Sequence, residues 1–437
     1  MNISRRPATP HTSRRTWPGR PACIVGLALA LAASGLPLDP ATAQETAAEP
    51  RLGDIDFPTS GAAEARPHFL RGVLYLHSFE YEDARQAFRR AREVDPDFAM
   101  AYWGEAMTHN HPVWMQQDRE AALASLERLA PTAEGRLAEA GSGKERDWLQ
   151  AIDVLYGAGS KEARDDAYRD AMRRMHEAYP DDHEVAAFYA LSILGTAHEG
   201  RDFSTYMRAA AVVEPVFDEN PRHPGAVHYL IHSYDDPIHA PLGLRAARAY
   251  SDIAPAAAHA QHMTSHIFVA LGMWGEVIEA NEVARDVQDT RRAELDRPPN
   301  RCGHYAYWLQ YGYLQKGRID DARRLLDLCH EQFVASPAST SAGYFASMRA
   351  RWLIDSGRWE EAGEWSAAFD GDAAGDEVAA ARDAHTDALA ALRAGDREAA
   401  SLHLERLESL RNEASEASAE PAILSLQARA RIALREG

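Results

Sequence analysis

Residues 223–274 read HPGAVHYLIHSYDDPIHAPLGLRAARAYSDIAPAAAHAQHMTSHIFVALGMW. Two pairs of histidines in this stretch have members four residues apart, His228 with His232 and His262 with His266. A spacing of four places both members of a pair on one face of an α-helix. The second pair follows the first by 34 residues. A fixed period of this length predicts similar units of two helices each, stacked one on the next.

The rest of the chain carries the same helical pattern. Windows rich in Ala, Arg and Glu recur, and no run of residues alternates in hydropathy as a strand does. In residues 83–94 an apolar stripe of Ala84, Ala87, Phe88 and Ala91 predicts a helix, which the following Asp-Pro ends. Glycine turns return in phase with such helices, each followed by a small residue: Gly272-Met273-Trp274 before Val277, Gly317-Arg318-Ile319 before Ala322, and Gly357-Arg358-Trp359 before Ala362.

These turns, small residues and closing prolines resemble those of the tetratricopeptide-repeat family over about residues 61–435. The resemblance implies an all-α, superhelical solenoid of antiparallel helix pairs. The first helix of each pair would line a concave groove that can hold a protein or peptide partner, and the second would form the convex back. We therefore expect a solenoid over residues 61–437, with His-rich units at about 183–318. The chain departs from the family pattern in three places, two long units and one insertion: 131–180, 181–221 and 285–302.

The resemblance also predicts where the histidines point. Both pairs fall at groove-lining positions, and apolar residues fill the packing positions between them. Helices packed about 8–10 Å apart bring such side chains together. Several imidazoles with a carboxylate suit a transition metal such as zinc, copper or iron, and the lack of cysteine argues against a thiolate site. Two further histidines extend this row of groove-lining histidines into the neighbouring units: His198, on a helix expected over 183–198, and His304. The predicted metal ligands are His198, His228, His232, Asp235, His259, His262, His266 and His304.

Several alternatives stay open at this point. The same site could serve a metal-dependent hydrolase or oxidoreductase, or the groove could be a metal-free scaffold for a partner protein or peptide. No phosphate loop, nucleophile elbow or His-Glu-X-X-His helix supports an enzyme. Asp235 or Asp236 could be a general base, orient a histidine, or begin the Asp-Asp-Pro turn.

A second set of histidines lies nearer the N-terminus, at His77, His109 and His111, with Trp114 close by. For these we expect turn and capping roles, unless the curvature of the solenoid brings them opposite the main row.

The N-terminus predicts export. Arginines precede an apolar run over residues 22–36, and Ala41-Thr42-Ala43 forms a small-residue cleavage site. The run is too short to span a membrane, so the mature chain has no expected membrane span. We predict a signal peptide over residues 1–43, a flexible leader over 44–60 and a periplasmic or secreted protein. Residues 13–17, Ser-Arg-Arg-Thr-Trp, resemble a twin-arginine motif, which leaves the export route open.

Net charge and cysteine content limit the partners and the kinds of fold that the chain can have. The 437-residue chain has a net charge of −19, which disfavours nucleic acid as a partner. Three cysteines exclude a disulfide scaffold or a four-cysteine zinc module. Within the implied helix pairs, Cys302 would begin the first helix of one unit and Cys329 would end the second. A disulfide between them would close a 27-residue loop and stabilise the fold by roughly 3 kcal/mol.

Overall fold

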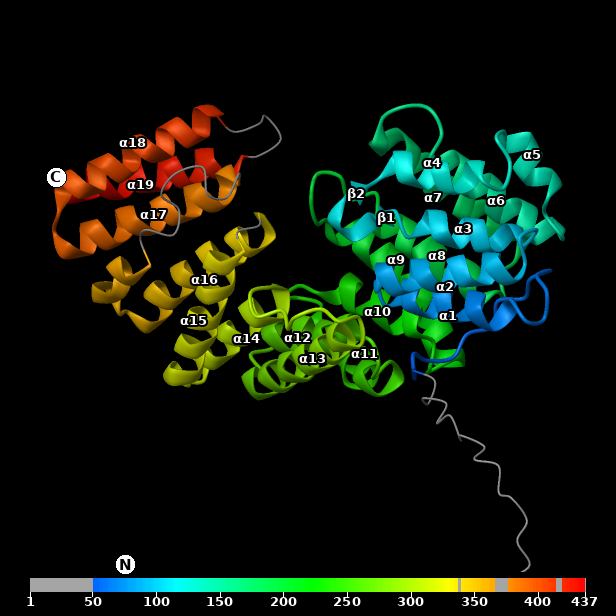
Figure 1. Ribbon diagram of the computed structural model, residues 1–437, viewed down its shortest axis with the longest axis horizontal. Coiled ribbons are helices and arrows are strands. Elements are labelled where there is room, and N and C mark those ends of the chain that lie inside the picture. The colour runs from blue at the N-terminus through cyan, green and yellow to red at the C-terminus, as the bar shows by residue number, and fades with distance from the viewer. Residues whose placement is uncertain (1–49, 337–338, 366–375, 414–418, 437) are drawn as a thin grey trace, which may run out of the picture. The chain divides into compact units, whose positions relative to one another are not determined.

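The computed structural model describes residues 50–336, 339–365, 376–413 and 419–436, and helices dominate all four ranges (Figure 1). The predicted signal peptide of residues 1–43 lies outside them. The α-helices are α1 (Arg66–His77), α2 (Tyr81–Val94), α3 (Ala99–Met107), α4 (Arg119–Glu127), α5 (Ala133–Ala138), α6 (Gly143–Leu155), α7 (Lys161–Ala178), α8 (His183–Leu194), α9 (Phe203–Glu219), α10 (Pro224–Tyr234), α11 (Ala240–Ile253), α12 (Ala258–Ala270), α13 (Trp274–Glu294), α14 (His304–Gln315), α15 (Ile319–Ala335), α16 (Ser339–Ser356), α17 (Glu377–Ala394), α18 (Arg397–Glu413) and α19 (Glu420–Glu436).

Few described residues adopt other regular structure. Two short 3-10 helices are η1 (Pro112–Trp114) and η2 (Trp359–Glu364). The strands β1 (Asn110–His111) and β2 (Gln116–Gln117) pair antiparallel around η1, with Asn110 opposite Gln117. The sequence pattern did not predict this pair, because two residues are too few to show an alternation. No described helix has the length and apolar character needed to cross a bilayer.

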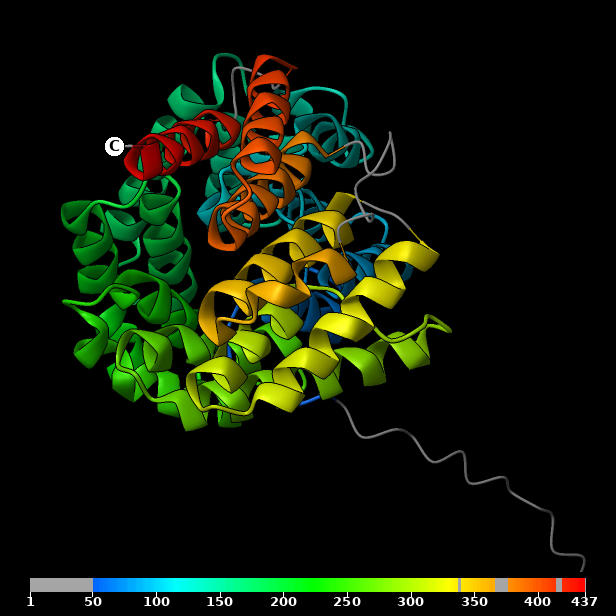
Figure 2. The ribbon, with the colours of Figure 1, turned by 90° about the vertical axis from the view of Figure 1, so that its left-hand side faces the viewer.

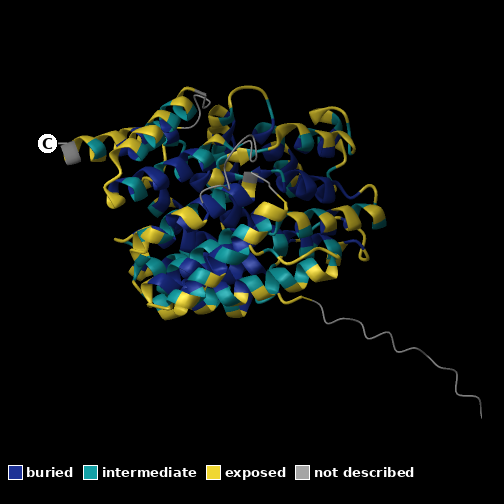
Figure 3. Cartoon of the chain, turned by 60° about the vertical axis from the view of Figure 1, so that its left-hand side comes forward, coloured by how far each residue is buried: buried dark blue, intermediate teal, exposed yellow. Residues whose placement is uncertain are grey.

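Consecutive helices pack as antiparallel pairs, and the first helices of successive pairs also contact one another, as α10 does α12 and α14 does α16. In Figures 1 and 2 the yellow helices α14, α15 and α16 run alongside one another. Figure 3 shows buried residues gathered on the faces where helices meet. The predicted all-α fold of stacked helix pairs is confirmed.

The glycine turns end the helices as predicted. Gly272, Gly317 and Gly357 have φ of 69°, 69° and 73°, in the left-handed region that a glycine enters without a Cβ clash. In α2 the predicted stripe of Ala84, Ala87, Phe88 and Ala91 is buried. These features are local, so spacing alone predicted them.

The α1–α2 hairpin departs from a simple solenoid, in which each unit contacts only its neighbours. α1 packs against α10. At the adjoining turn, Glu80 Oε1 accepts a hydrogen bond of 2.9 Å from the backbone N–H of His259. Arg291 on α13 donates to Asp83 with a Nε–Oδ1 distance of 2.8 Å. The N-terminal unit is therefore joined to units more than a hundred residues later.

Residues 50–57 differ from the predicted flexible leader. Leu52 and Phe57 are buried, and the Phe57 ring lies 5.2 Å from that of Phe69 and 5.3 Å from that of Trp148. Burial of two large apolar side chains stabilises this segment against the helices by about 1.5–3 kcal/mol each. The prediction failed here because the segment has no helical period to reveal its packing.

Cys302 and Cys329, the predicted pair, are joined by a disulfide across α15 and the residues that precede α14. The bridge holds the end of the 285–302 insertion against the second helix of its unit. A crosslink over 27 residues restricts the unfolded chain and contributes roughly 3 kcal/mol in the chain-entropy model.

The buried Arg349 of α16 makes a pH-dependent contact with α17. Its guanidinium donates to Asp383 Oδ1 at 2.6 Å and also to Asp387. Burial, together with the charge of Asp387, raises the pKa of Asp383 to about 7 despite the opposing effect of Arg349. One arginine cannot neutralise two buried carboxylates, so the more deeply buried one keeps its proton.

We expect the free energy of unfolding to fall as pH rises from about 4 to about 7, because the folded Asp383 holds a proton that the unfolded chain has already lost. In Asp383→Asn this part of the pH dependence should disappear. Between pH 4 and pH 7 the free energy of unfolding of the wild type should fall by a few kcal/mol, on the order of magnitude of this pKa shift, relative to that of the variant. Urea denaturation of both proteins at pH 5 and pH 8 gives the free energy of unfolding at each pH. The same change with pH in both proteins would contradict the assignment to Asp383.

Candidate metal centre

Two contacting helices, α10 and α12, carry the predicted histidine pairs. His228 and His232 lie one turn apart on α10, and His262 and His266 one turn apart on α12. His259 lies in the first turn of α12. All five side chains are turned into the molecule, and His228 and His262 are completely buried. The structure separates the predicted single site into two neighbouring histidine groups.

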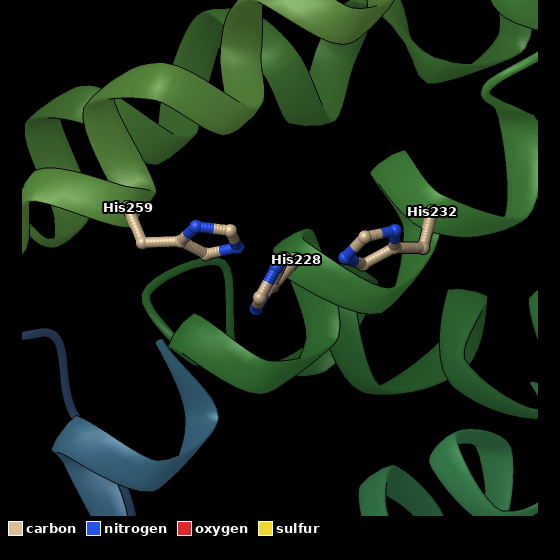
Figure 4. Close-up of side chains that lie close together, drawn as sticks. All are labelled: His228, His232 and His259. Atoms are coloured by element: carbon tan, nitrogen blue, oxygen red, sulfur yellow. The ribbon is translucent and has the colours of Figure 1, made fainter. Parts of the chain in front are cut away.

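The first histidine group consists of His228, His232 and His259. One nitrogen of each ring lies within 4.8 Å of the other two, and the rings converge from α10 and α12 (Figure 4). His228 Nδ1 lies 2.6 Å from the carbonyl oxygen of His77, so Nδ1 carries the hydrogen and Nε2 keeps its lone pair. Nε2 of each of the three rings is buried and has no hydrogen-bond partner among the described residues. The group thus presents three buried nitrogens to one point.

The second histidine group consists of His262, His266 and His304, whose ligand atoms also lie within 4.8 Å of one another. His262 Nδ1 lies 2.7 Å from Asn281 Oδ1, and Asn281 Nδ2 donates to Val277 O, which fixes the amide orientation. His266 Nδ1 lies 2.7 Å from the carboxylate of Asp235. Both Nδ1 atoms therefore carry hydrogens, so in the neutral form of each ring the lone pair is on Nε2.

The two Nε2 atoms of His262 and His266 are only 3.1 Å apart. Two lone pairs at this distance repel each other unless a proton or a metal ion lies between them. Two bonds of about 2.0–2.1 Å to one ion, at angles from square to tetrahedral, would place the nitrogens about 2.9–3.4 Å apart. The observed separation fits that range.

Burial keeps most of these imidazoles uncharged near neutral pH. It lowers the pKa of His228 to about 3 and that of His304 to about 4. Burial, and then the neighbouring imidazoles, also lowers the pKa of His232, His259 and His262. A neutral imidazole is the form that coordinates a metal. Five of the six imidazoles, His228, His232, His259, His262 and His304, are therefore in the form that coordinates a metal.

Asp235 and Asp236 take different roles. Asp235 pairs with His266, and although burial opposes ionisation, the interaction with His266 holds the pKa of this carboxyl below its usual range. Asp236 Oδ1 accepts from the backbone N–H of Ile238 and of His239 at 2.9 Å each. One aspartate orients a histidine and the other forms the turn before α11, so two of the three roles raised for this pair occur. Neither belongs to a histidine group as a ligand.

His198 does not join the row. The predicted helix over 183–198 ends at Leu194, so His198 falls in the loop after α8, where its Nε2 lies 3.3 Å from Asp165. Among the second set, His111 stacks on Tyr81 with ring centroids 3.9 Å apart, and the His109 carbonyl accepts from Asp118 N–H. These two take local roles in a turn, as expected.

His77 belongs to a third, hydrogen-bonded group with Glu184 and His223, all fully buried. His77 Nε2 lies 2.8 Å from Glu184 Oε2, and His223 Nε2 lies 3.1 Å from Oε1. His223 Nδ1 accepts from Ala226 N–H, so its Nε2 carries the hydrogen. Gly225 allows the close approach, since a Cβ there would lie 2.4 Å from His77 Nδ1.

This third group joins α1, α8 and the start of α10. Burial would raise the pKa of Glu184, but the two histidines outweigh it and lower that pKa to about 2. The group also positions the His77 carbonyl that holds His228. Sequence reasoning missed it because the three residues are far apart in the chain; the one local signal was His223 at the N-cap of α10.

A cavity of about 950 Å³ reaches both histidine groups. Its walls include His259 of the first group and His304 of the second. The insertion before α14 forms one side, through residues 298–303, and the indole of Trp114 lines another. The cavity links the buried imidazoles to the surface next to the disulfide.

The stacked antiparallel helix pairs, with glycine turns between them, define an all-helical repeat protein. The family model described as "Tetratricopeptide repeat" matches residues 65–98, which span α1 and α2. Residues 65–98 are therefore similar to one tetratricopeptide repeat.

Three solved structures illustrate how distant the similarities are. Yeast Tom70 is 11% identical with a TM-score of 0.36, covering 85% of this chain and 89% of that one. The APC/C hetero-tetramer Cut9–Hcn1 is 15% identical with a TM-score of 0.31, covering 86% and 78%. The human IFIT1 dimer with m7Gppp-AAAA is 14% identical with a TM-score of 0.31, covering 87% and 78%. No curated protein matches the sequence.

Proposed function

We propose that this all-helical repeat protein binds a first-row transition-metal ion through His262, His266 and His304. The observation that carries the proposal is the 3.1 Å separation of the Nε2 atoms of His262 and His266. Asn281 and Asp235 occupy the opposite ring nitrogens, so both lone pairs face the same point. His304 adds a third nitrogen from the next helix pair.

A metal ion accounts for this arrangement better than a shared proton does. A proton bridges two nitrogens and leaves the third without a role, whereas three neutral imidazoles match a common ligand set for zinc, copper or iron. Asp235 on His266 is the usual partner that orients a metal-bound imidazole and raises its basicity. Trp308 stacks on His266 with centroids 4.4 Å apart and restricts its rotation.

The test is elemental analysis of purified protein and of His262→Ala/His266→Ala. The wild type should carry at least one equivalent of a transition metal that the variant has lost. The matched control is His183→Ala/His403→Ala, which removes two histidines outside the three groups and should retain wild-type metal content. Circular dichroism of each variant separates loss of ligands from loss of fold. A wild type without metal, even after incubation with Zn²⁺, Cu²⁺ or Fe²⁺, would contradict the proposal.

We also propose that the protein acts outside the cytoplasm. The disulfide between Cys302 and Cys329 supports this, since such bonds persist in oxidising compartments. The basic and apolar N-terminal pattern supports it independently. N-terminal sequencing of protein purified from its host should find a chain that begins near Gln44, and an intact N-terminus would contradict export.

A further inference from the structure

The first histidine group has unpaired nitrogens that the single-ion proposal leaves unexplained. Nε2 of His228, His232 and His259 are all buried without a hydrogen-bond partner among the described residues. A buried polar atom left unpaired costs about 1–3 kcal/mol, so three at one point are a concentrated cost. Coordination of one ion by all three would offset it. One nitrogen of each ring lies within 4.8 Å of the other two, so small rotations of the rings would bring all three within bonding distance of one ion.

Phe79, whose ring forms one wall of the first histidine group, has a strained backbone conformation. Phe79 has φ of 54°, a left-handed conformation that a bulky side chain rarely adopts and that costs on the order of 1–2 kcal/mol. Its ring packs against all three imidazoles, with centroid distances of 4.3 Å to His228, 5.7 Å to His232 and 5.6 Å to His259. Strain of this kind persists where the surrounding structure requires it, most often at functional sites.

The two histidine groups are direct neighbours. The rings of His232 and His266 lie 6.3 Å apart, and those of His259 and His262 lie 6.0 Å apart. Each group is built from one nitrogen of each of three histidines, and each contributes a residue to the wall of the 950 Å³ cavity. Ions in the two groups would therefore share one access route from solvent.

Charge balance indicates what would enter by that route. The six imidazoles bring no negative charge and the adjacent Asp235 carboxylate brings one, so two divalent ions would leave the centre positive. The cavity walls also carry Arg292 and Arg301 against one carboxylate, Glu331. A positive site with low-dielectric walls favours a small anion as the remaining ligand.

We infer that His228, His232 and His259 hold a second transition-metal ion beside the one in the second group, and that the paired ions bind a small oxyanion, a carboxylate or phosphate, through the cavity. This inference rests on the proposed function and extends it from one ion to two. It also names the class of ligand.

Metal stoichiometry tests the second ion. Protein stripped with a chelator and reloaded with Co²⁺ should bind two equivalents, as should His183→Ala/His403→Ala, while His228→Ala/His232→Ala should bind one. A wild type that binds one equivalent, retained in His228→Ala/His232→Ala and lost in His262→Ala/His266→Ala, would overturn the second ion and leave the proposed function intact. A wild type that binds none would overturn both.

Two further outcomes are informative. If the wild type binds a single equivalent of Co²⁺ and His228→Ala/His232→Ala binds none, the ion lies in the first histidine group. That outcome would contradict both the proposed ion in the second group and the inferred pair of ions. If a variant fails to fold, the wild-type stoichiometry still decides, and magnetic coupling between two Cu²⁺ ions in the wild type provides a second readout. Two uncoupled ions would overturn the paired centre.

Inorganic phosphate and acetate, titrated separately into the Co²⁺-loaded wild type, test the ligand. At least one should change the visible cobalt spectrum saturably, and the two titrations distinguish a phosphate ligand from a carboxylate. An unchanged spectrum with both probes would overturn the oxyanion part of the inference.

Discussion

Replacing Glu184 by glutamine should lower the free energy of unfolding by about 1–3 kcal/mol, the usual cost of leaving a buried hydrogen-bonding group unsatisfied. The Glu184 carboxylate accepts from His77 Nε2 at 2.8 Å and lies 3.1 Å from His223 Nε2, with all three side chains buried. A glutamine amide has one oxygen, so its NH₂ group would face one of the two N–H donors. Urea denaturation at pH 7 measures the loss.

The matched control is Glu219→Gln. Glu219 also contacts a histidine, with 3.0 Å between its Oε2 and His183 Nε2, but its side chain is 69% exposed. Exposed pairs contribute about 0–1 kcal/mol, so this variant should be close to the wild type. Equal losses in the two variants would show that the third group does not hold α1 to α8 and α10.

Replacing Asp235 by asparagine should weaken metal binding about 10- to 100-fold without unfolding the protein. Asp235 holds His266 Nδ1–H at 2.7 Å and so keeps Nε2 directed at the candidate ion. Loss of a carboxylate that orients a metal-bound histidine typically has an effect of this size, because the imidazole becomes less basic and less well aligned. Competition with a chromophoric chelator at fixed pH gives the affinity.

For Asp235→Asn, the matched control is Asp218→Asn. The Asp218 side chain is 63% exposed and pairs with Arg245, on the same part of the chain but away from the histidines. Its metal affinity should equal that of the wild type. An unchanged affinity in Asp235→Asn would mean that Asp235 plays no part in the centre, and a lowered melting temperature there would point to a structural role.

The spacing of residues along the chain was sufficient to predict the helices and the helix face on which each histidine pair lies. The four-residue spacing of His228 with His232 and of His262 with His266 put each pair on one side of its helix, and both pairs are turned inward. Gly272 and Gly317 were recognised as turns for the same reason, since a residue with positive φ favours glycine wherever it lies.

Spacing did not predict the positions of histidines whose contacts are with residues distant in the chain. His198 was placed in the row by its 34-residue period, but α8 ends at Leu194, so the period no longer described its position. His77 was assigned a turn role, because no local pattern relates it to Glu184 or His223. The return of α1 to α10 brings these residues together.

The amino-acid sequence by itself determined an all-helical repeat with two inward-facing histidine pairs, because hydrogen bonds within a helix and burial of its apolar face depend on residues a few positions apart. The tertiary structure alone decided that the histidines form two groups of three. That division depends on the rotation of α10 against α12, on the approach of His304 and on the packing of Phe79 from the N-terminal unit. These are packing contacts between distant segments, and no short-range pattern encodes them.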